Sequence, residues 1–169
     1  MPRGADGYAT IEGVAKGAYV LKDFGDVGSE KTVVIVATGS EVQLAVAAAE
    51  ALAGEGVATR VVSMPCREWF DEQDDDYRES VLPSDVRARV SVEAAVAQGW
   101  RDVVGDAGRT VSIEHFGASA DYETLYREFG LTGEAVAEAA RDSLRAAREG
   151  ARPGGRATTA TEGGAADQQ

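Results

Sequence analysis

Apolar residues run without interruption through residues 33–36, and the run ends at a glycine turn. A half-exposed strand would alternate apolar and polar residues, so this run predicts a parallel strand covered by helices on both faces. After Gly39, apolar residues recur at helical spacing over residues 42–53, which predicts an amphipathic helix lying on the sheet. Ser40 and Gln43 have the spacing of a capping box at the start of that helix.

Shorter apolar segments complete a predicted α/β domain. Further strands are expected at residues 18–22, 58–64, 88–92 and 109–113. Apolar side chains recur at helical spacing in three later segments, residues 96–103, 122–129 and 136–147. The first two of these helices carry aromatic residues and are expected to cover the later strands. Thr132 is expected to cap the third helix.

Composition divides the chain into three parts. Residues 1–11 are short of apolar side chains and are expected to be a linker-like segment. Residues 12–148 hold all the predicted strands and helices and are expected to form one domain. Residues 149–169 contain no large apolar side chain. They cannot bury enough surface to offset the entropy of ordering, so a disordered tail is expected there.

The formal net charge of -12 describes an acidic surface. Such a surface repels phosphate backbones and anionic lipids, which argues against nucleic acids and membranes as partners. The single cysteine, Cys66, cannot form an internal disulfide, and the sequence shows no signal peptide or long apolar segment. A cytoplasmic location is therefore expected.

Residues that commonly carry catalysis are few. His115 and Cys66 each occur once and lie at the ends of different predicted elements, so they are interpreted as a strand-end histidine and a small buried hydrophobe. They cannot supply the three or four ligands that zinc needs. The carboxylates within residues 71–76 lack the alternation of a calcium loop and are interpreted as a solvated face. No catalytic, cofactor-binding or metal-ligating residue is predicted.

One turn offers a weak candidate for anion binding, formed by Gly39, Ser40 and Glu41. Backbone N–H groups at the start of the following helix could bind an anion there. The Ser40 hydroxyl and the Glu41 charge are placed to satisfy the same donors and the helix dipole, so capping is the competing interpretation. The sequence has no G-x-G-x-x-G or Walker A run, which leaves a nucleotide without its usual cradle.

Several segments, in order along the chain, resemble the C-terminal domain of transketolases. These segments are residues 15–22 (AKGAYVLK), 35–42 (IVATGSEV), 60–65 (RVVSMP), 70–73 (FDEQ), 77–83 (YRESVLP) and 116–120 (FGASA). The resemblance extends from about residue 12 to residue 148, and residues 63–83 are the part most specific to transketolases. It implies a three-layer α/β fold with a five-stranded mixed, mostly parallel sheet flanked by helices.

The resemblance also implies a homodimeric enzyme that uses thiamine diphosphate and Mg²⁺ to move a two-carbon ketol unit between sugar phosphates in the pentose phosphate pathway. The family's cofactor-metal motif begins Gly-Asp-Gly and ends in Asn. Here Gly25-Asp26 is followed by Val27, Gly105-Asp106 is followed by Ala107, and the sequence contains no Asn. No catalytic residue of the family can therefore be assigned to this chain.

Two functional hypotheses follow. The first is the C-terminal domain or split subunit of a transketolase, inactive alone, with a structural, dimer-supporting or regulatory role. Its partners would be the missing cofactor-binding domains and a dimer mate. The alternative is a stand-alone α/β module that binds a small anion at residues 39–41, and a truncated reading frame without function is a third possibility. Four apolar residues either face the missing domains or fill the core of this one: Trp69, Phe70, Trp100 and Tyr122.

Overall fold

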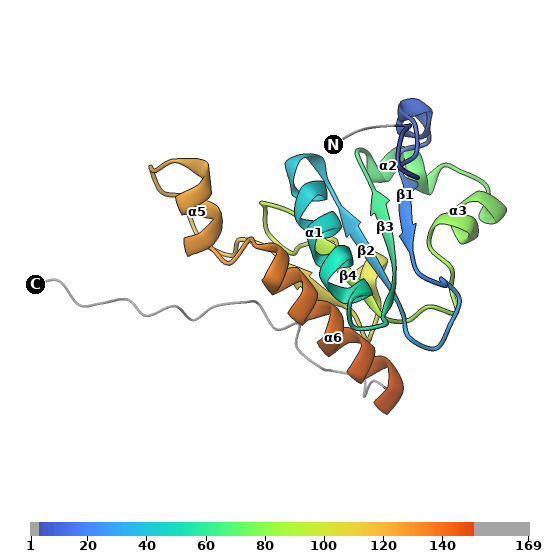
Figure 1. Cartoon of the computed structure of the whole chain (residues 1–169). Helices are drawn as coiled ribbons and strands as arrows, with labels where there is room; N and C mark the ends of the chain where they lie inside the picture. The colour runs from blue at the N-terminus through green and yellow to red at the C-terminus, as the bar shows by residue number, and fades with distance from the viewer. Residues whose placement is uncertain (1–3, 151–169) are drawn as a thin grey trace, which may run out of the picture.

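A five-stranded sheet lies between two layers of helices in the computed structural model, which describes residues 4–150 (Figure 1). The strands are β1 (Tyr19–Phe24), β2 (Thr32–Ala37), β3 (Ala58–Ser63), β4 (Arg89–Val92) and β5 (Arg109–Val111), in the spatial order β1-β3-β2-β4-β5. Strand β1 runs antiparallel to β3, whereas every other neighbouring pair is parallel. The predicted fold class, a mixed and mostly parallel sheet flanked by helices, is confirmed.

The sheet is built around β2, whose six residues are all buried. Because successive side chains point to opposite faces, Val33 and Ile35 enter one core and Val34 and Val36 enter the other. Ile35 lies opposite Val61 of β3 and the equivalent valine of β4. This two-sided burial explains why the β2 sequence is apolar throughout and does not alternate.

Two long helices cover one face and three short helices cover the other. The first core contains side chains of α1 (Val42–Ala53) and α6 (Gly133–Glu149). The second contains side chains of α2 (Arg67–Asp71), α3 (Asp75–Val81) and α4 (Arg101–Val104). Two 3₁₀ segments, η1 (Ile11–Lys16) and η2 (Gly39–Glu41), precede β1 and α1.

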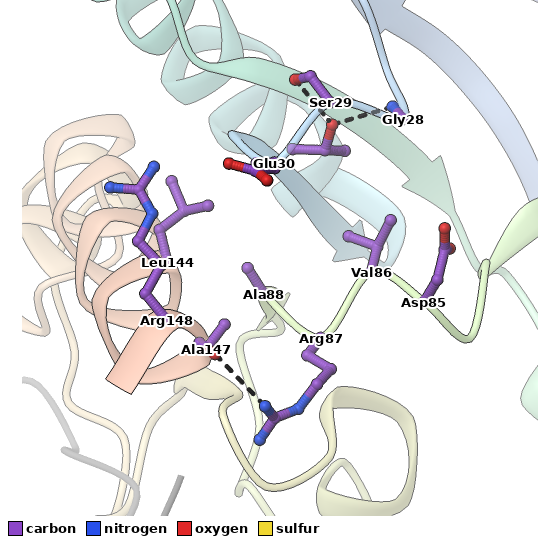
Figure 2. Close-up of a pocket in the computed structure, with 11 residues that line it drawn as sticks. Gly28, Ser29, Glu30, Asp85, Val86, Arg87, Ala88, Leu144, Ala147 and Arg148 are labelled. Atoms are coloured by element: carbon purple, nitrogen blue, oxygen red, sulfur yellow. Dashed lines mark hydrogen bonds between the residues drawn. The ribbon is translucent and has the colours of Figure 1, made fainter. Parts of the chain in front are cut away.

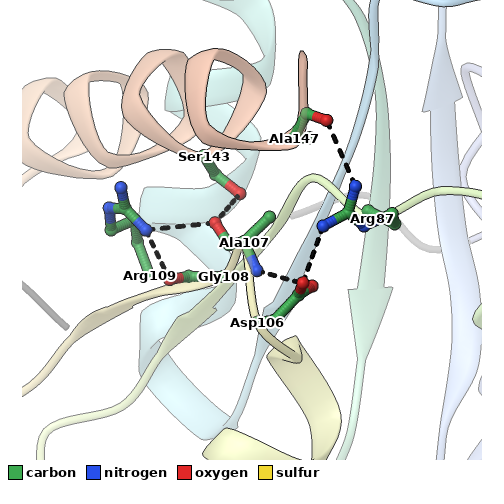
Figure 3. A network of polar contacts seen from close by, with 7 residues as sticks. All are labelled: Arg87, Asp106, Ala107, Gly108, Arg109, Ser143 and Ala147. Atoms are coloured by element: carbon green, nitrogen blue, oxygen red, sulfur yellow. Dashed lines mark hydrogen bonds and ion pairs between the residues drawn. The ribbon is translucent and has the colours of Figure 1, made fainter. Parts of the chain in front are cut away.

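Helix α6 is held on the sheet by a buried serine (Figure 3). The Ser143 hydroxyl accepts a hydrogen bond from the Arg89 backbone N–H at 2.9 Å and lies 2.9 Å from the Ala107 carbonyl, to which it donates. At the start of the helix, Thr132 Oγ1 accepts from the Ala135 N–H at 3.2 Å, so the predicted cap is confirmed. Single hydroxyl groups therefore fix the start of α6 and a buried position within it.

The two predicted aromatic-rich helices differ from expectation. Residues 96–103 form mostly turns, with a four-residue α4 at their end, although Trp100 and Val103 are buried as their spacing suggested. Helix α5 (Tyr122–Glu128) has no buried residue and projects away from the sheet (Figure 1). The expectation that it covers the later strands is wrong, because α1 and α6 already occupy that face.

The predicted domain boundaries at residues 12 and 148 remain predictions. Helix α6 ends at Glu149, and the expected tail lies outside the described residues except for its first two positions. None of the helices within residues 4–150 combines the length and the apolar character needed to cross a membrane.

Candidate interface at the carboxyl edge of the sheet

The carboxyl ends of β2, β3, β4 and β5 lie at one edge of the sheet because these strands are parallel. The amino end of β1 lies at the same edge because β1 is antiparallel. We call this the carboxyl edge and the opposite one the amino edge. From β2 the chain crosses to one side, and from β4 it crosses to the other. Ligands commonly bind outside such a switch point in α/β sheets.

The exposed large apolar side chains are distributed along the carboxyl edge. All six that occur in the described part of the chain lie on segments that enter or leave this edge: Ile11, Val14, Trp69, Val96, Phe116 and Tyr122. The segments η1, α2 and α5 lie toward this end of the sheet in Figure 1. Of the four apolar residues left open by the sequence, Phe70 and Trp100 are buried, whereas Trp69 and Tyr122 are exposed.

Side chains of the domain bond to one another across the switch point. One carboxylate oxygen of Glu93, just after β4, accepts from Trp100 Nε1 at 2.7 Å, and the other accepts from Thr38 Oγ1 at 3.3 Å. A cavity of about 400 Å³ beside them is also lined by Met64 and Cys66. Both Glu93 oxygens therefore accept hydrogen bonds from within the domain, while Arg67 and Glu68 also line the cavity.

The predicted turn places Gly39, Ser40 and Glu41 together at the same edge. Gly39 adopts a positive φ of 45°, which suits glycine. The predicted capping box is wrong, because α1 has no side-chain cap and the Ser40 hydroxyl instead donates to the Glu41 carboxylate at 2.8 Å. Tyr126 of α5 donates to the same carboxylate oxygen. The arrangement therefore attaches α5 to the domain.

Burial distinguishes this carboxylate from those on the acidic surface. Glu41 is only 5% exposed, and the Glu41 N–H donates to the Thr38 carbonyl at 3.0 Å. Burial, followed by the hydrogen bond to Glu41, raises the pKa of the Tyr126 phenol above its usual range. The phenol therefore stays protonated and able to donate at neutral pH. Anion binding at residues 39–41 remains a prediction, and a buried carboxylate opposes it electrostatically.

His115 and Cys66 have different surroundings. Cys66 is half-buried, less than the sequence interpretation expected, and its thiol donates to Glu68 at 3.5 Å. The exposed His115 ring packs edge-on against Phe129 with ring centres 4.5 Å apart. Within the acidic run, Asp74 caps α3 by accepting from the Tyr77 N–H at 2.8 Å.

The residues present do not fit the family's thiamine diphosphate and metal site. Among residues 4–150, no group of three or more His, Cys, Asp or Glu side chains is arranged to hold a metal ion. The buried polar atoms without partners in that range belong to Thr59, Arg109 and Thr110. These residues lie on β3 and β5, and the sequence has neither the Gly-Asp-Gly start nor the Asn of the motif.

The amino edge has a different chemical character. A cavity of about 430 Å³ lies there. Figure 2 shows its lining, in which the charged side chains of Glu30, Asp85, Arg87 and Arg148 stand beside apolar ones such as Val86 and Leu144. Arg87 pairs with Asp106 at 2.6 Å and also donates to the Ala147 carbonyl at 3.3 Å. Charged side chains such as these are stable in contact with water and need no partner protein to cover them.

Comparison with known proteins decides the family. A sequence model described as "Transketolase-like TK C-terminal domain" matches residues 17–132. The chain belongs to this family of transketolase C-terminal domains. Transketolase from Mycobacterium tuberculosis is 59% identical over 135 residues, which cover 79% of this chain and 19% of the relative. The chloroplastic transketolase-1 of Arabidopsis thaliana is 52% identical over 132 residues, which cover 78% of this chain and 18% of the relative.

Solved structures agree with the transketolase C-terminal fold. Transketolase from Leishmania mexicana superposes with a TM-score of 0.75 at 47% identity, covering 88% of this chain and 21% of that one. A split-gene transketolase described as an inactive beta4 tetramer has a TM-score of 0.58 over 78% of this chain and 43% of that one. At 24% identity, this second likeness supports the fold alone. The chain spans about a fifth of the length of the curated relatives that it matches.

Proposed function

We propose that this chain is the non-catalytic C-terminal part of a thiamine diphosphate- and Mg²⁺-dependent transketolase, present either as a domain or as a split subunit. The complete enzyme would transfer a two-carbon ketol unit between sugar phosphates in the pentose phosphate pathway, as a dimer. Catalytic and cofactor-binding residues would come from the other domains. We also propose a cytoplasmic location, although plant relatives are named as chloroplastic.

One observation carries the proposal, namely the position of all six exposed large apolar side chains of the described residues along the carboxyl edge. Apolar side chains grouped on one surface are typical of protein interfaces. The matched relatives have about four fifths of their length outside the matched region, so a large additional body is available to cover this edge. Structural support of the cofactor-binding domains follows from such a contact.

Reconstitution tests the proposal. The purified chain is mixed with the part of Mycobacterium tuberculosis transketolase outside the matched residues, together with thiamine diphosphate and Mg²⁺. Circular dichroism first establishes that both pieces are folded. Co-elution on gel filtration, with ketol transfer above that of the catalytic part alone, is the expected result. If both pieces are folded but neither associate nor change in activity, the proposal is wrong.

The alternative function is a stand-alone module that binds a small anion at Gly39, Ser40 and Glu41. The positive φ of Gly39 and the twelve-residue helix that follows favour it. Inorganic phosphate should then raise the melting temperature of the wild-type chain, and Ser40→Ala should abolish that rise. Because Glu41 places a buried carboxylate at the same turn, we favour the transketolase subunit.

A further inference from the structure

We infer that residues 115–130, which we call the arm, form the main contact with the cofactor-binding part of a transketolase, with Phe116 as the central anchor. The arm comprises the loop after β5 and helix α5. This inference rests on the proposed function and assigns the surface through which that function acts. It also predicts the chemistry of the surface that receives the arm.

The arm exposes large aromatic side chains to solvent, which is unfavourable unless a partner covers them. The Phe116 side chain is 98% exposed and that of Tyr122 is 64% exposed. Residues 114–123 are all exposed, and α5 buries none of its residues despite its regular apolar spacing. Aromatic side chains that become buried in a partner's pocket commonly dominate the affinity of an interface.

Specific contacts fix the shape of the arm before a partner binds. The rings of His115 and Phe129 pack together near its two ends, with centres 4.5 Å apart. Tyr122 packs edge-on against Tyr126, with centres 6.1 Å apart. An arm that is already ordered loses less conformational entropy on docking than a disordered one.

Tyr126 connects the arm to the body of the domain. Its hydroxyl donates to the buried Glu41 carboxylate and lies 3.1 Å from the Ser40 hydroxyl. Among the described residues, Tyr126 is the one arm residue whose side chain hydrogen-bonds outside the arm. The pair of Tyr126 and Glu41 therefore sets the direction in which Phe116 is presented.

Three observations identify the partner that binds the arm as the cofactor-binding part of a transketolase: the length of the matched relatives, the extent of the family match and the charge of the arm. The family match spans residues 17–132 and so includes the arm, while about four fifths of each matched Mycobacterium relative lies elsewhere in its chain. The arm carries three carboxylates, Asp121, Glu123 and Glu128, against one arginine, Arg127. A complementary surface on the cofactor-binding part would be an apolar pocket with Lys or Arg at its rim.

Substitution of the anchor tests the inference in the full chain. Phe116→Ala should weaken binding to the catalytic part of the Mycobacterium tuberculosis enzyme about 30-fold, the effect of losing one buried phenyl ring. Isothermal titration calorimetry measures the Kd. The melting temperature of the variant chain should not change, since Phe116 makes almost no contact within the domain. Val27→Ala is the control and should bind like wild type, because Val27 is a half-buried residue of the β1–β2 loop at the amino edge.

Tyr126→Phe provides a second variant, which removes the hydroxyl that donates to Glu41 but keeps the ring. Binding should weaken about fivefold, corresponding to one lost hydrogen bond that orients the arm. If the wild-type chain binds and the Kd of Phe116→Ala is within twofold of the wild-type Kd, the arm is not the main contact. The proposed function would remain intact in that case. A folded wild-type chain that does not bind the catalytic part at all would overturn both.

Discussion

At the amino edge, charged side chains pair with one another, as Arg87 does with Asp106 and Arg141 does with Glu55. At the carboxyl edge, by contrast, Phe116 and Tyr122 face solvent, while Glu93 and Glu41 accept hydrogen bonds from side chains of the same chain. Charged pairs occur at both edges, as Arg67 with Asp102 shows at the carboxyl edge, but the exposed large apolar side chains of the described residues lie at the carboxyl edge alone.

This difference indicates which edge is stable in contact with water and which is expected to bind a partner. Exposed ion pairs lose little by remaining in water, because water and salt screen them. Covering an exposed phenylalanine with another apolar surface lowers the free energy, because apolar area is removed from water. The amino edge is therefore interpreted as a solvent-facing surface and the carboxyl edge as an interface. The predictions below test that contrast through the contacts on which each edge depends.

The largest effect is expected for Gly17→Ala at the carboxyl edge. Gly17 has a φ of 82°, and an added Cβ would lie 2.3 Å from the Phe70 nitrogen and 2.4 Å from the Cys66 carbonyl oxygen. Strain and overlap with α2 should lower the free energy of unfolding by about 3 kcal/mol, measured by urea denaturation.

A second glycine with a similar φ distinguishes the effect of steric overlap at Gly17 from the effect of backbone strain. Gly56, which follows α1 at the amino edge, has a φ of 72° and nothing within 4 Å of an added Cβ. Gly56→Ala should therefore cost about 1 kcal/mol, from strain alone. Equal losses in the two variants would contradict the tight contact between η1 and α2 at the carboxyl edge.

The next effect is expected at Ser143, which joins α6 to β4 near the amino edge. Ser143→Ala would leave the part-buried Arg89 N–H and the Ala107 carbonyl without this hydroxyl. Figure 3 shows the contact with Ala107. Loss of these hydrogen bonds should lower the free energy of unfolding by about 2 kcal/mol, measured by urea denaturation. Ser119→Ala, on the exposed arm, should change stability little and serves as the control. A Ser143 variant as stable as this control would show that α6 is held by apolar packing alone.

Local sequence patterns predicted the parts of the fold that depend on neighbouring residues. The apolar run in β2 identified a strand buried on both faces, and Thr132 identified the start of α6. In both cases the information lies within a few residues, in the spacing of apolar side chains or in one hydroxyl before a helix. The transketolase family was likewise predictable, from ordered segments spread over most of the chain.

Contacts between distant residues were not predictable in this way. The capping box failed because Ser40 and Glu41 form hydrogen bonds with Tyr126, which is 85 residues beyond Glu41. The apolar spacing of α5 showed that the helix has an apolar face, but it could not show that α1 and α6 would already cover the sheet. Nor could spacing reveal that Phe116 is almost fully exposed, because exposure depends on what the whole fold leaves uncovered.

The smallest effect is expected for Asp106→Asn, whose cost in stability should depend on pH. The hydrogen bond from Arg87, followed by the charge of Arg87, lowers the pKa of the Asp106 carboxyl below its usual value. A carboxyl whose pKa is lower when folded stabilises the protein above its unfolded pKa of about 4, and that contribution is lost as the pH falls through the folded pKa. Because both side chains are more than one-third exposed, Asp106→Asn should cost only about 0.5 kcal/mol at pH 7.

Tyr126 should respond at the opposite end of the pH range. Its pKa is raised in the folded state, so its contribution is fully present below the unfolded pKa of about 10 and is lost as the pH rises through the folded pKa. Urea denaturation at pH 3 and pH 7 should therefore show the cost of Asp106→Asn approaching zero in acid, while the cost of Tyr126→Phe stays constant. A cost of Tyr126→Phe that also disappeared at pH 3 would contradict this contrast. The carboxyl edge would then share the acid sensitivity of the amino edge.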